Sequence, residues 1–120
     1  MEVMYEGQVN SPQTALVEAI DAAQVEVLVK DASILPAPPN LLTIGFDSPF
    51  AETVKLISKV DNLITVERAF QGVAKAWEKN TSIARVFTEY DYDSLRVNLE
   101  ELIAGANNFI ITNKFISDHY

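Results

Sequence analysis

Apolar and polar residues alternate in several short runs of this chain, and a period of two is typical of half-buried β-strands. In the clearest run, Val25, Val27 and Val29 alternate with the residues at 26, 28 and 30. The same reasoning predicts four further strands, at Leu41–Phe46, Glu52–Ile57, Leu63–Arg68 and Ile83–Phe87. Short strands at this spacing predict a mainly β fold, a small antiparallel β-sandwich or open barrel with one C-terminal α-helix.

Turn-forming residues separate these strands. Asp61 and Asn62 suit turn geometry, so a Ser58–Asn62 loop is expected to join the strands on either side into a hairpin. Three prolines lie within Pro36–Pro39. Because proline cannot donate a ladder hydrogen bond, this segment is expected to be a rigid extended connection that also breaks any helix.

The segment Thr14–Ala23 allows two interpretations. Its sequence, TALVEAIDAA, is rich in good helix formers. The strand beginning at Val25 follows with almost no room for a turn, and the family resemblance described below favours an extended segment. We expect the extended form.

The clearest helix pattern follows residue 90. Asp91 or Asp93 can cap the first turn, and Gly105 is expected to end the helix. Ending there gives a helix of about 10 to 12 residues, because glycine commonly stops a helix just past its last turn. One face of this helix carries apolar side chains, namely Leu95, Leu99, Leu102 and Ile103.

Four segments are therefore expected: an N-terminal arm (1–13), a β domain (14–90), a helix packing on the domain or on a neighbour (91–105) and an apolar C-terminal tail (106–120). Exposed apolar surfaces usually find a partner. The predicted partner-contact residues are Leu95, Leu99, Leu102, Phe109, Ile110 and Phe115.

The charge distribution narrows the range of partners. The 120 residues carry a formal net charge of -8, with 17 acidic and 9 basic side chains. No stripe of Lys and Arg is present to replace the counterions of phosphates, so neither nucleic acid nor an acidic membrane surface is expected as a partner. No apolar run approaches the roughly 20 residues of a membrane span, and the opening ten residues lack the features of a signal peptide.

Residues suited to catalysis are scarce. The chain has no Cys, its one His is His119, and its four glycines lie too far apart to form a phosphate-binding loop. Asp91-x-Asp93 lacks the further oxygen ligands of a calcium loop, so helix capping is favoured over metal binding. Neither a metal nor another cofactor is expected. Glycoside chemistry through a pair of carboxylates remains open, with three candidates: Glu52, Glu67 and Glu89.

Two further side chains allow a structural and a functional interpretation. Trp77 could stack on a sugar, but a lone Trp in a small domain is more often part of the core. Arg68 could bind an anion, but at a strand end it more plausibly donates several hydrogen bonds to loop carbonyls. The structural interpretation is preferred for both residues.

The residues around these two form the pattern Val66-x-Arg68-Ala69-x-x-Gly72-x-Ala74-x-x-Trp77-x-x-Asn80-x-x-Ile83. This pattern resembles one found in tail-tip and baseplate-associated proteins of tailed bacteriophages. It is similar in particular to the N-terminal, shoulder-like module of siphophage receptor-binding proteins, and the similarity covers roughly residues 14 to 90. This chain has Ala69 and Asn80 where glycine is usual, and Val73 where threonine is usual.

The resemblance implies a β-sandwich that attaches to the tail tip, in which Arg68, Gly72 and Trp77 support a strand-to-strand connector. It further implies a structural virion protein, an adaptor or assembly component of the distal tail. Such a protein would contact other tail-tip proteins, form a homotrimer or homohexamer, occupy the host cytoplasm during assembly and catalyse no reaction. The alternative is a carbohydrate-binding module for the host cell wall, with Trp77, Tyr90 and Tyr92 as stacking rings. An accessory domain of a cell-wall hydrolase is a third possibility.

Overall fold

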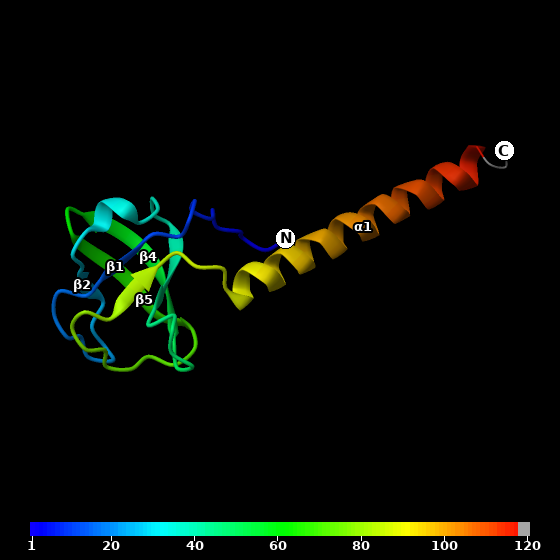
Figure 1. The fold of residues 1–120 in the computed structure, drawn as a ribbon. Helices are drawn as coiled ribbons and strands as arrows, with labels where there is room; N and C mark the ends of the chain where they lie inside the picture. Colours follow the sequence, from blue (N-terminus) through cyan, green and yellow to red (C-terminus); the bar gives the residue numbers. More distant parts are fainter. Residues whose placement is uncertain (118–120) are drawn as a thin grey trace. The chain divides into compact units, whose positions relative to one another are not determined.

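A computed structural model describes the backbone of residues 1–117 and the side chains of residues 1–105 (Figure 1). The chain forms two compact units. One comprises Tyr5–Thr88, and the other joins Met1–Met4 to the residues from Glu89 onward.

The unit Tyr5–Thr88 is an antiparallel sheet curled into a half-barrel (Figure 1). Neighbouring strands follow the order β1-β6-β3-β4-β5-β2. The two edge strands, β1 and β2, approach each other at their C-terminal ends. There Leu16 forms an isolated antiparallel bridge with Val29, and Val17 N–H donates to Leu28 O over 3.0 Å. Of the two expected architectures, the open barrel is the one observed. Its elements are β1 (Gln13–Ala15), β2 (Glu26–Leu28), the 3-10 helix η1 (Ala32–Ile34), β3 (Asn40–Ile44), β4 (Glu52–Val60), β5 (Leu63–Gln71) and β6 (Ser82–Ala84).

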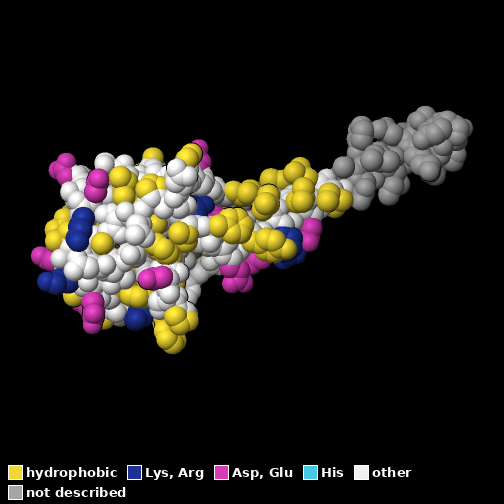
Figure 2. Space-filling view, viewed as in Figure 1, with side chains coloured by type: hydrophobic (Ala, Val, Ile, Leu, Met, Phe, Trp, Pro, Cys, Tyr) yellow, Lys and Arg dark blue, Asp and Glu magenta, His cyan; other side chains and the backbone are white. Residues whose placement is uncertain are grey.

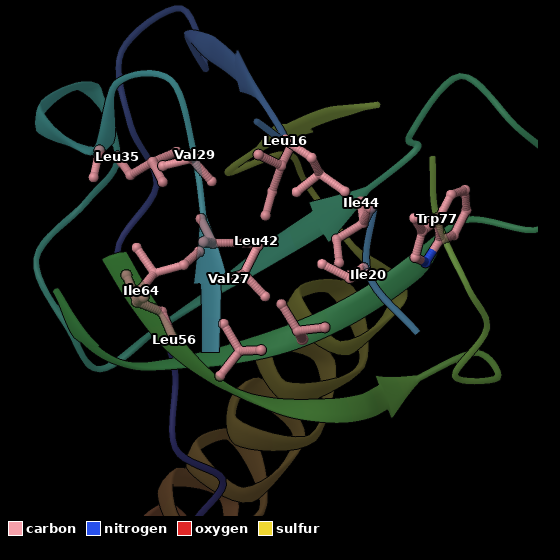
Figure 3. Packing of buried hydrophobic residues seen from close by; sticks show 14 residues of the cluster. Leu16, Ile20, Val27, Val29, Leu35, Leu42, Ile44, Leu56, Ile64 and Trp77 are labelled. Carbon is pink, nitrogen blue, oxygen red and sulfur yellow. The ribbon is translucent and has the colours of Figure 1, made fainter. Parts of the chain in front are cut away.

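The core lies on the concave side of this sheet (Figure 3). β3 lies between β6 and β4, and all five of its residues are buried. Leu42 and Ile44 of β3 belong to the core cluster, and Trp77 lies at one end of it (Figure 3). The remaining members are Leu16, Ile20, Val27, Val29, Ala32, Leu35, Val54, Leu56, Ile64, Val66 and Ile83.

Each predicted strand is present, but most strand ends differ from the prediction: β3 ends at Ile44 rather than Phe46, and β5 continues to Gln71 rather than ending at Arg68. The expected Ser58–Asn62 loop is wrong, because Ser58 and Lys59 still pair with β5 and only Asp61 and Asn62 form the turn. β6 ends at Ala84 rather than at Phe87, since its register with β1 and β3 ends there.

The ambiguous segment after residue 13 is extended. Thr14 and Ala15 belong to β1, Leu16 N–H donates to Thr81 O over 3.0 Å, and Ile20 forms a bridge with Trp77. Pairing with distant strands therefore outweighs the helix propensity of these residues. The proline segment 36–39 contains neither helix nor strand, as expected.

The expected N-terminal arm (1–13) does not form one structural segment. Residues from Tyr5 onward belong to the barrel unit, where Glu6 O accepts bonds from Asn40 Nδ2 over 3.0 Å and from Arg85 Nε over 2.9 Å. Gln8 Nε2 likewise donates to Ile34 O over 2.6 Å. The β domain therefore begins earlier than residue 14.

The second unit contains α1 (Glu89–Ser117), a helix of 29 residues. The expected short helix ending at Gly105 is wrong, and so is the separate tail from residue 106. One glycine inside a helix costs only about 1 kcal/mol relative to alanine, and no proline follows to stop the helix. The predicted capping by Asp91 or Asp93 is also wrong, because both residues lie inside the helix. Asp91 lies in the first turn, where a negative charge interacts favourably with the helix dipole.

The first residues of the chain lie along α1 in this unit. Glu2 N–H donates to Asn98 Oδ1 over 2.6 Å, and Asn98 Nδ2 returns a bond to Glu2 O over 2.9 Å. The terminal amine of Met1 lies 3.3 Å from a carboxylate oxygen of Glu101. Among the residues that the structure describes, no helix combines the length and apolar character needed to cross a bilayer.

Candidate functional site

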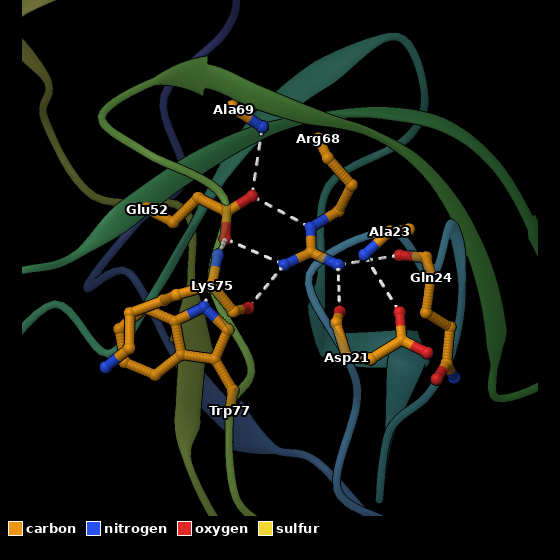
Figure 4. A network of polar contacts seen from close by, with 8 residues as sticks. All are labelled: Asp21, Ala23, Gln24, Glu52, Arg68, Ala69, Lys75 and Trp77. Carbon is orange, nitrogen blue, oxygen red and sulfur yellow. Dashed lines mark hydrogen bonds and ion pairs between the residues drawn. The ribbon is translucent and has the colours of Figure 1, made fainter.

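The most concentrated polar cluster in the barrel surrounds Glu52 at the start of β4 (Figure 4). Its side chain is fully buried. One carboxylate oxygen accepts bonds from Arg68 Nη2 (2.9 Å), Trp77 Nε1 (3.0 Å) and the Lys75 N–H (3.3 Å). The other accepts bonds from Arg68 Nε (2.8 Å) and the Ala69 N–H (2.9 Å). Five donors therefore compensate the loss of water around this charge.

These donors also set the protonation state of Glu52. Burial alone raises the pKa of a carboxyl group, because it disfavours the charged form. Here the hydrogen bonds from Arg68, Trp77 and the Ala69 N–H, with the positive charge of Arg68, outweigh burial, and the pKa of Glu52 lies below its usual value. The carboxylate is charged at neutral pH.

Arg68 uses all of its donors within the protein. Besides its two bonds to Glu52, its Nη1 donates to Asp21 O (2.6 Å) and Gln24 O (2.8 Å), and its Nη2 donates to Lys75 O (2.8 Å). A guanidinium has five N–H groups, and these five bonds employ each of them. No donor is left for an anion. The expected donation to loop carbonyls agrees with the structure.

Trp77 belongs to the core rather than to the surface. Only 6% of the residue is exposed, and its indole N–H is engaged by Glu52. A Cβ added to Gly45 would lie 2.4 Å from the ring, so the glycine provides the space that Trp77 fills. The ring is therefore not available to stack on a sugar.

Three residues of the phage-like pattern have left-handed backbone conformations. Their φ angles are +52° at Ala69, +80° at Gly72 and +68° at Asn80. At Gly72 a Cβ would also lie 2.9 Å from Ala51 O. Ala69 and Asn80 stand where the pattern usually has glycine, which is the residue that adopts this conformation most easily.

The arrangement does not support the glycosidase hypothesis. Glu52 is buried, charged and saturated with donors, whereas a catalytic acid must hold a proton and reach the substrate. Glu67 is an exposed residue of β5 opposite Lys55, and Glu89 belongs to the other unit. Among the described residues, no group of three His, Asp or Glu side chains could hold a metal ion.

Sequence reasoning identified Arg68 and Trp77 but missed their shared partner. Glu52 was assigned only to a strand end and to possible carboxylate chemistry. The available signal was the alternation along β4, which puts Glu52 on the same face as Val54 and Leu56, because a charge on a buried face needs a partner.

Two apolar surfaces remain exposed. In the barrel, Phe50 and Val73 are 70% and 78% exposed beside an open hollow of about 450 Å³ that Lys75 also lines. In the other unit, the face of α1 predicted to contact partners is exposed (Figure 2), at 47% for Leu95, 51% for Leu99 and 59% for Leu102. The side chains of the other predicted contacts, Phe109, Ile110 and Phe115, lie outside the described residues.

Neither a scan of protein-family models nor a search of curated proteins found a match to this chain. The geometry itself defines a small open barrel whose polar cluster holds its own loops together. It also provides a helix whose apolar face is exposed.

Proposed function

We propose that the protein is a structural component of a bacteriophage tail, an adaptor in the tail tip or baseplate that acts through protein–protein contacts. Its place of action is the virion, after assembly in the host cytoplasm. It catalyses no reaction in this role and needs no cofactor. The barrel provides a rigid body, and α1 provides the contact surface.

The exposed apolar face of α1 is the observation that carries this proposal. Tyr92 and Ile103 are 56% and 51% exposed, and they extend the surface made by Leu95, Leu99 and Leu102. Contiguous apolar patches of this kind mark interaction sites in proteins. The left-handed residues of the phage-like pattern support the tail assignment, since Ala69 and Asn80 keep the backbone that glycine would have there.

The carbohydrate-binding alternative gains no support from the three rings on which it rested. Trp77 is buried, and the Tyr90 hydroxyl donates to Val3 O over 2.5 Å. Tyr92 is exposed, at 56%, but it lies among leucines on α1. One ring on an apolar stripe resembles a protein contact more than a sugar platform.

Immunogold labelling tests the proposal. Antibodies raised against the purified protein are applied to phage particles produced by cells that carry its gene. Label is expected at the distal end of the tail. Particles with normal tails and no label would overturn the assignment to the finished virion and the proposal with it.

A complementation experiment tests the contact surface itself. The gene is deleted and supplied again as the wild type, as Leu99→Lys or as Ala104→Lys. Ala104 is an exposed residue of α1 away from the apolar stripe, so its lysine variant is the matched control. We expect complete tails from the wild type and from Ala104→Lys, and defective tails from Leu99→Lys. Equal restoration by all three would rule out α1 as the contact surface.

A further inference from the structure

The apolar stripe of α1 has the spacing of a coiled-coil seam. Tyr92, Leu95, Leu99 and Leu102 follow one another at intervals of three, four and three residues, and each is between 47% and 59% exposed. Alternating intervals of three and four are the a and d positions of a heptad repeat. We call these four residues the seam.

The surface between the seam residues has the shape that such packing needs. A groove of about 170 Å³ is lined by Tyr92, Leu95, Arg96 and Leu99. In a coiled coil, each a or d side chain inserts into a hole formed by four residues of the facing helix. Two a positions, one d position and the neighbouring e position supply such a hole here.

The sequence extends the seam beyond the described side chains. The α1 backbone is helical to Ser117, and 29 residues at about 1.5 Å each give a helix of about 43 Å, or about four heptads. The next positions in the same register are occupied by Ala106, Phe109, Asn113 and Ile116. A single polar Asn among apolar a positions is a known determinant of register in coiled coils.

The charges near the seam favour a like helix over a basic partner. Asp93, Glu100 and Glu101 occupy positions b and c, on the side of the helix away from the seam. Beside the seam, Glu89 and Arg96 occupy e positions and Asp91 a g position, and Arg96 is held by Glu100 over 2.9 Å. A basic partner would need acids along the whole stripe, whereas the acids here lie only at its N-terminal end, and two copies of α1 bring no row of like charges together.

We propose that α1 associates with α1 of a second copy of this chain as a coiled coil, with Tyr92, Leu95, Leu99 and Leu102 at its interface. This inference rests on the part of the proposed function that makes α1 the contact surface. The partner it adds is the protein itself. The seam is self-complementary, as a symmetric interface between identical chains requires.

Sedimentation of the purified full chain at several concentrations is the first test. The wild type is expected at a multiple of its monomer mass of 13.3 kDa. Leu95→Lys, in which a charge replaces a seam residue, is expected at the monomer mass itself. Ala104→Lys is the matched control and is expected to associate as the wild type does. Because Leu95 and Ala104 are both exposed, both variants are expected to keep the wild-type circular dichroism of the dilute protein. A wild type that stays monomeric at every concentration, or a Leu95→Lys variant that associates normally, would overturn the proposal.

Cross-linking locates the interface. The chain has no Cys, so a single introduced thiol can pair only with its counterpart in another copy. Leu102 lies close to the middle of α1, so that Leu102→Cys can form a disulfide whichever way the two helices run. We expect rapid oxidation to a covalent dimer for Leu102→Cys and little for Ala104→Cys. Equal oxidation of the two variants would place the interface elsewhere.

These outcomes separate this inference from the proposed function. A wild type that sediments as a monomer but labels phage tails would remove the coiled coil and leave the tail assignment intact, with another tail protein as the partner of α1. Self-association through the seam without any label on phage tails would support the coiled coil and remove the tail assignment.

Discussion

Replacing Glu52 by glutamine tests whether the buried cluster holds the barrel together. The change keeps the size of the side chain but removes its charge, and it turns one acceptor into an NH₂ donor. That donor would face N–H groups of Arg68, Trp77 or the backbone at Ala69. Arg68, whose side chain is only 7% exposed, would then carry a buried charge without a counter-charge.

The expected loss follows from these contacts. Removing one partner of a buried ion pair costs about 3–5 kcal/mol. The loss for Glu52→Gln is expected in the upper part of this range, because all five donors to Glu52 lose a charged acceptor. A domain of this size is stable by about 5–15 kcal/mol. At a typical urea dependence of about 1–3 kcal/mol per M, the midpoint is expected to fall by roughly 2 M.

Urea unfolding followed by Trp fluorescence measures this loss, because Trp77 is the only Trp and lies in the cluster. Glu67→Gln is the matched control: it makes the same chemical change at an exposed position of the same unit, and its effect is expected within about 0.5 kcal/mol. Far-UV circular dichroism provides a second probe of both transitions. A loss below about 1 kcal/mol for Glu52→Gln would refute the role assigned to the cluster.

The same variant has a defined dependence on pH. Because the pKa of Glu52 is lowered in the folded protein, its stabilising contribution is fully present above the unfolded pKa of about 4.3. The contribution is lost as the pH falls through the lower, folded value. The difference in unfolding free energy between wild type and Glu52→Gln is therefore expected to be constant near neutral pH and to shrink below about pH 4.3. A difference that grew on acidification would contradict the sign of this pKa shift.

Glycine and alanine exchanges test the backbone. Gly45→Ala would push a methyl group to 2.4 Å from Trp77 at a φ of +63°, so a loss of at least about 2 kcal/mol is expected by urea unfolding. Gly105→Ala, whose Cβ meets no atom within 4 Å, is expected to raise helix content by circular dichroism and stabilise α1 by about 0.5–1 kcal/mol. Ala69→Gly relieves a left-handed φ of +52° and is expected to stabilise the barrel by up to about 1 kcal/mol; in the helix, Ala104→Gly is expected to destabilise by about that amount. If Gly45→Ala stabilised the protein and Gly105→Ala destabilised it, or if Ala69→Gly destabilised it and Ala104→Gly stabilised it, these assignments would be refuted.

Much of the barrel could be predicted from the sequence, because its strands depend on a local signal. The period-two pattern around Val27 predicted β2, and turn residues at Asp61 and Asn62 placed the hairpin correctly. The hairpin strands run further than predicted. Cross-strand pairing extends β4 to Val60 through polar residues that carry no apolar signal of their own.

The partner of Arg68 and the length of α1 could not be predicted for different reasons. Glu52 and Arg68 lie on either side of an irregularity in the β4–β5 register, between Thr53 and Lys55, and such an irregularity leaves no mark in composition. Gly105 is a local stop signal, but α1 continues through it because the apolar spacing of the helix continues on both sides. Interactions that depend on register or on neighbouring turns are set by the whole fold rather than by one segment.

The bonds of Arg68 have a consequence for the order of folding. Its bonds to Glu52 span 16 residues and can form once the β4–β5 hairpin exists, whereas its bonds to Asp21 O and Gln24 O span 47 and 44 residues. Closing a longer loop costs more entropy, so we expect the segment around Asp21 and Gln24 to join a hairpin in which Glu52 already orients the guanidinium. The bonds of Arg68 to Asp21 O and Gln24 O are therefore expected to form late in folding, when the connection between β1 and β2 packs against the hairpin.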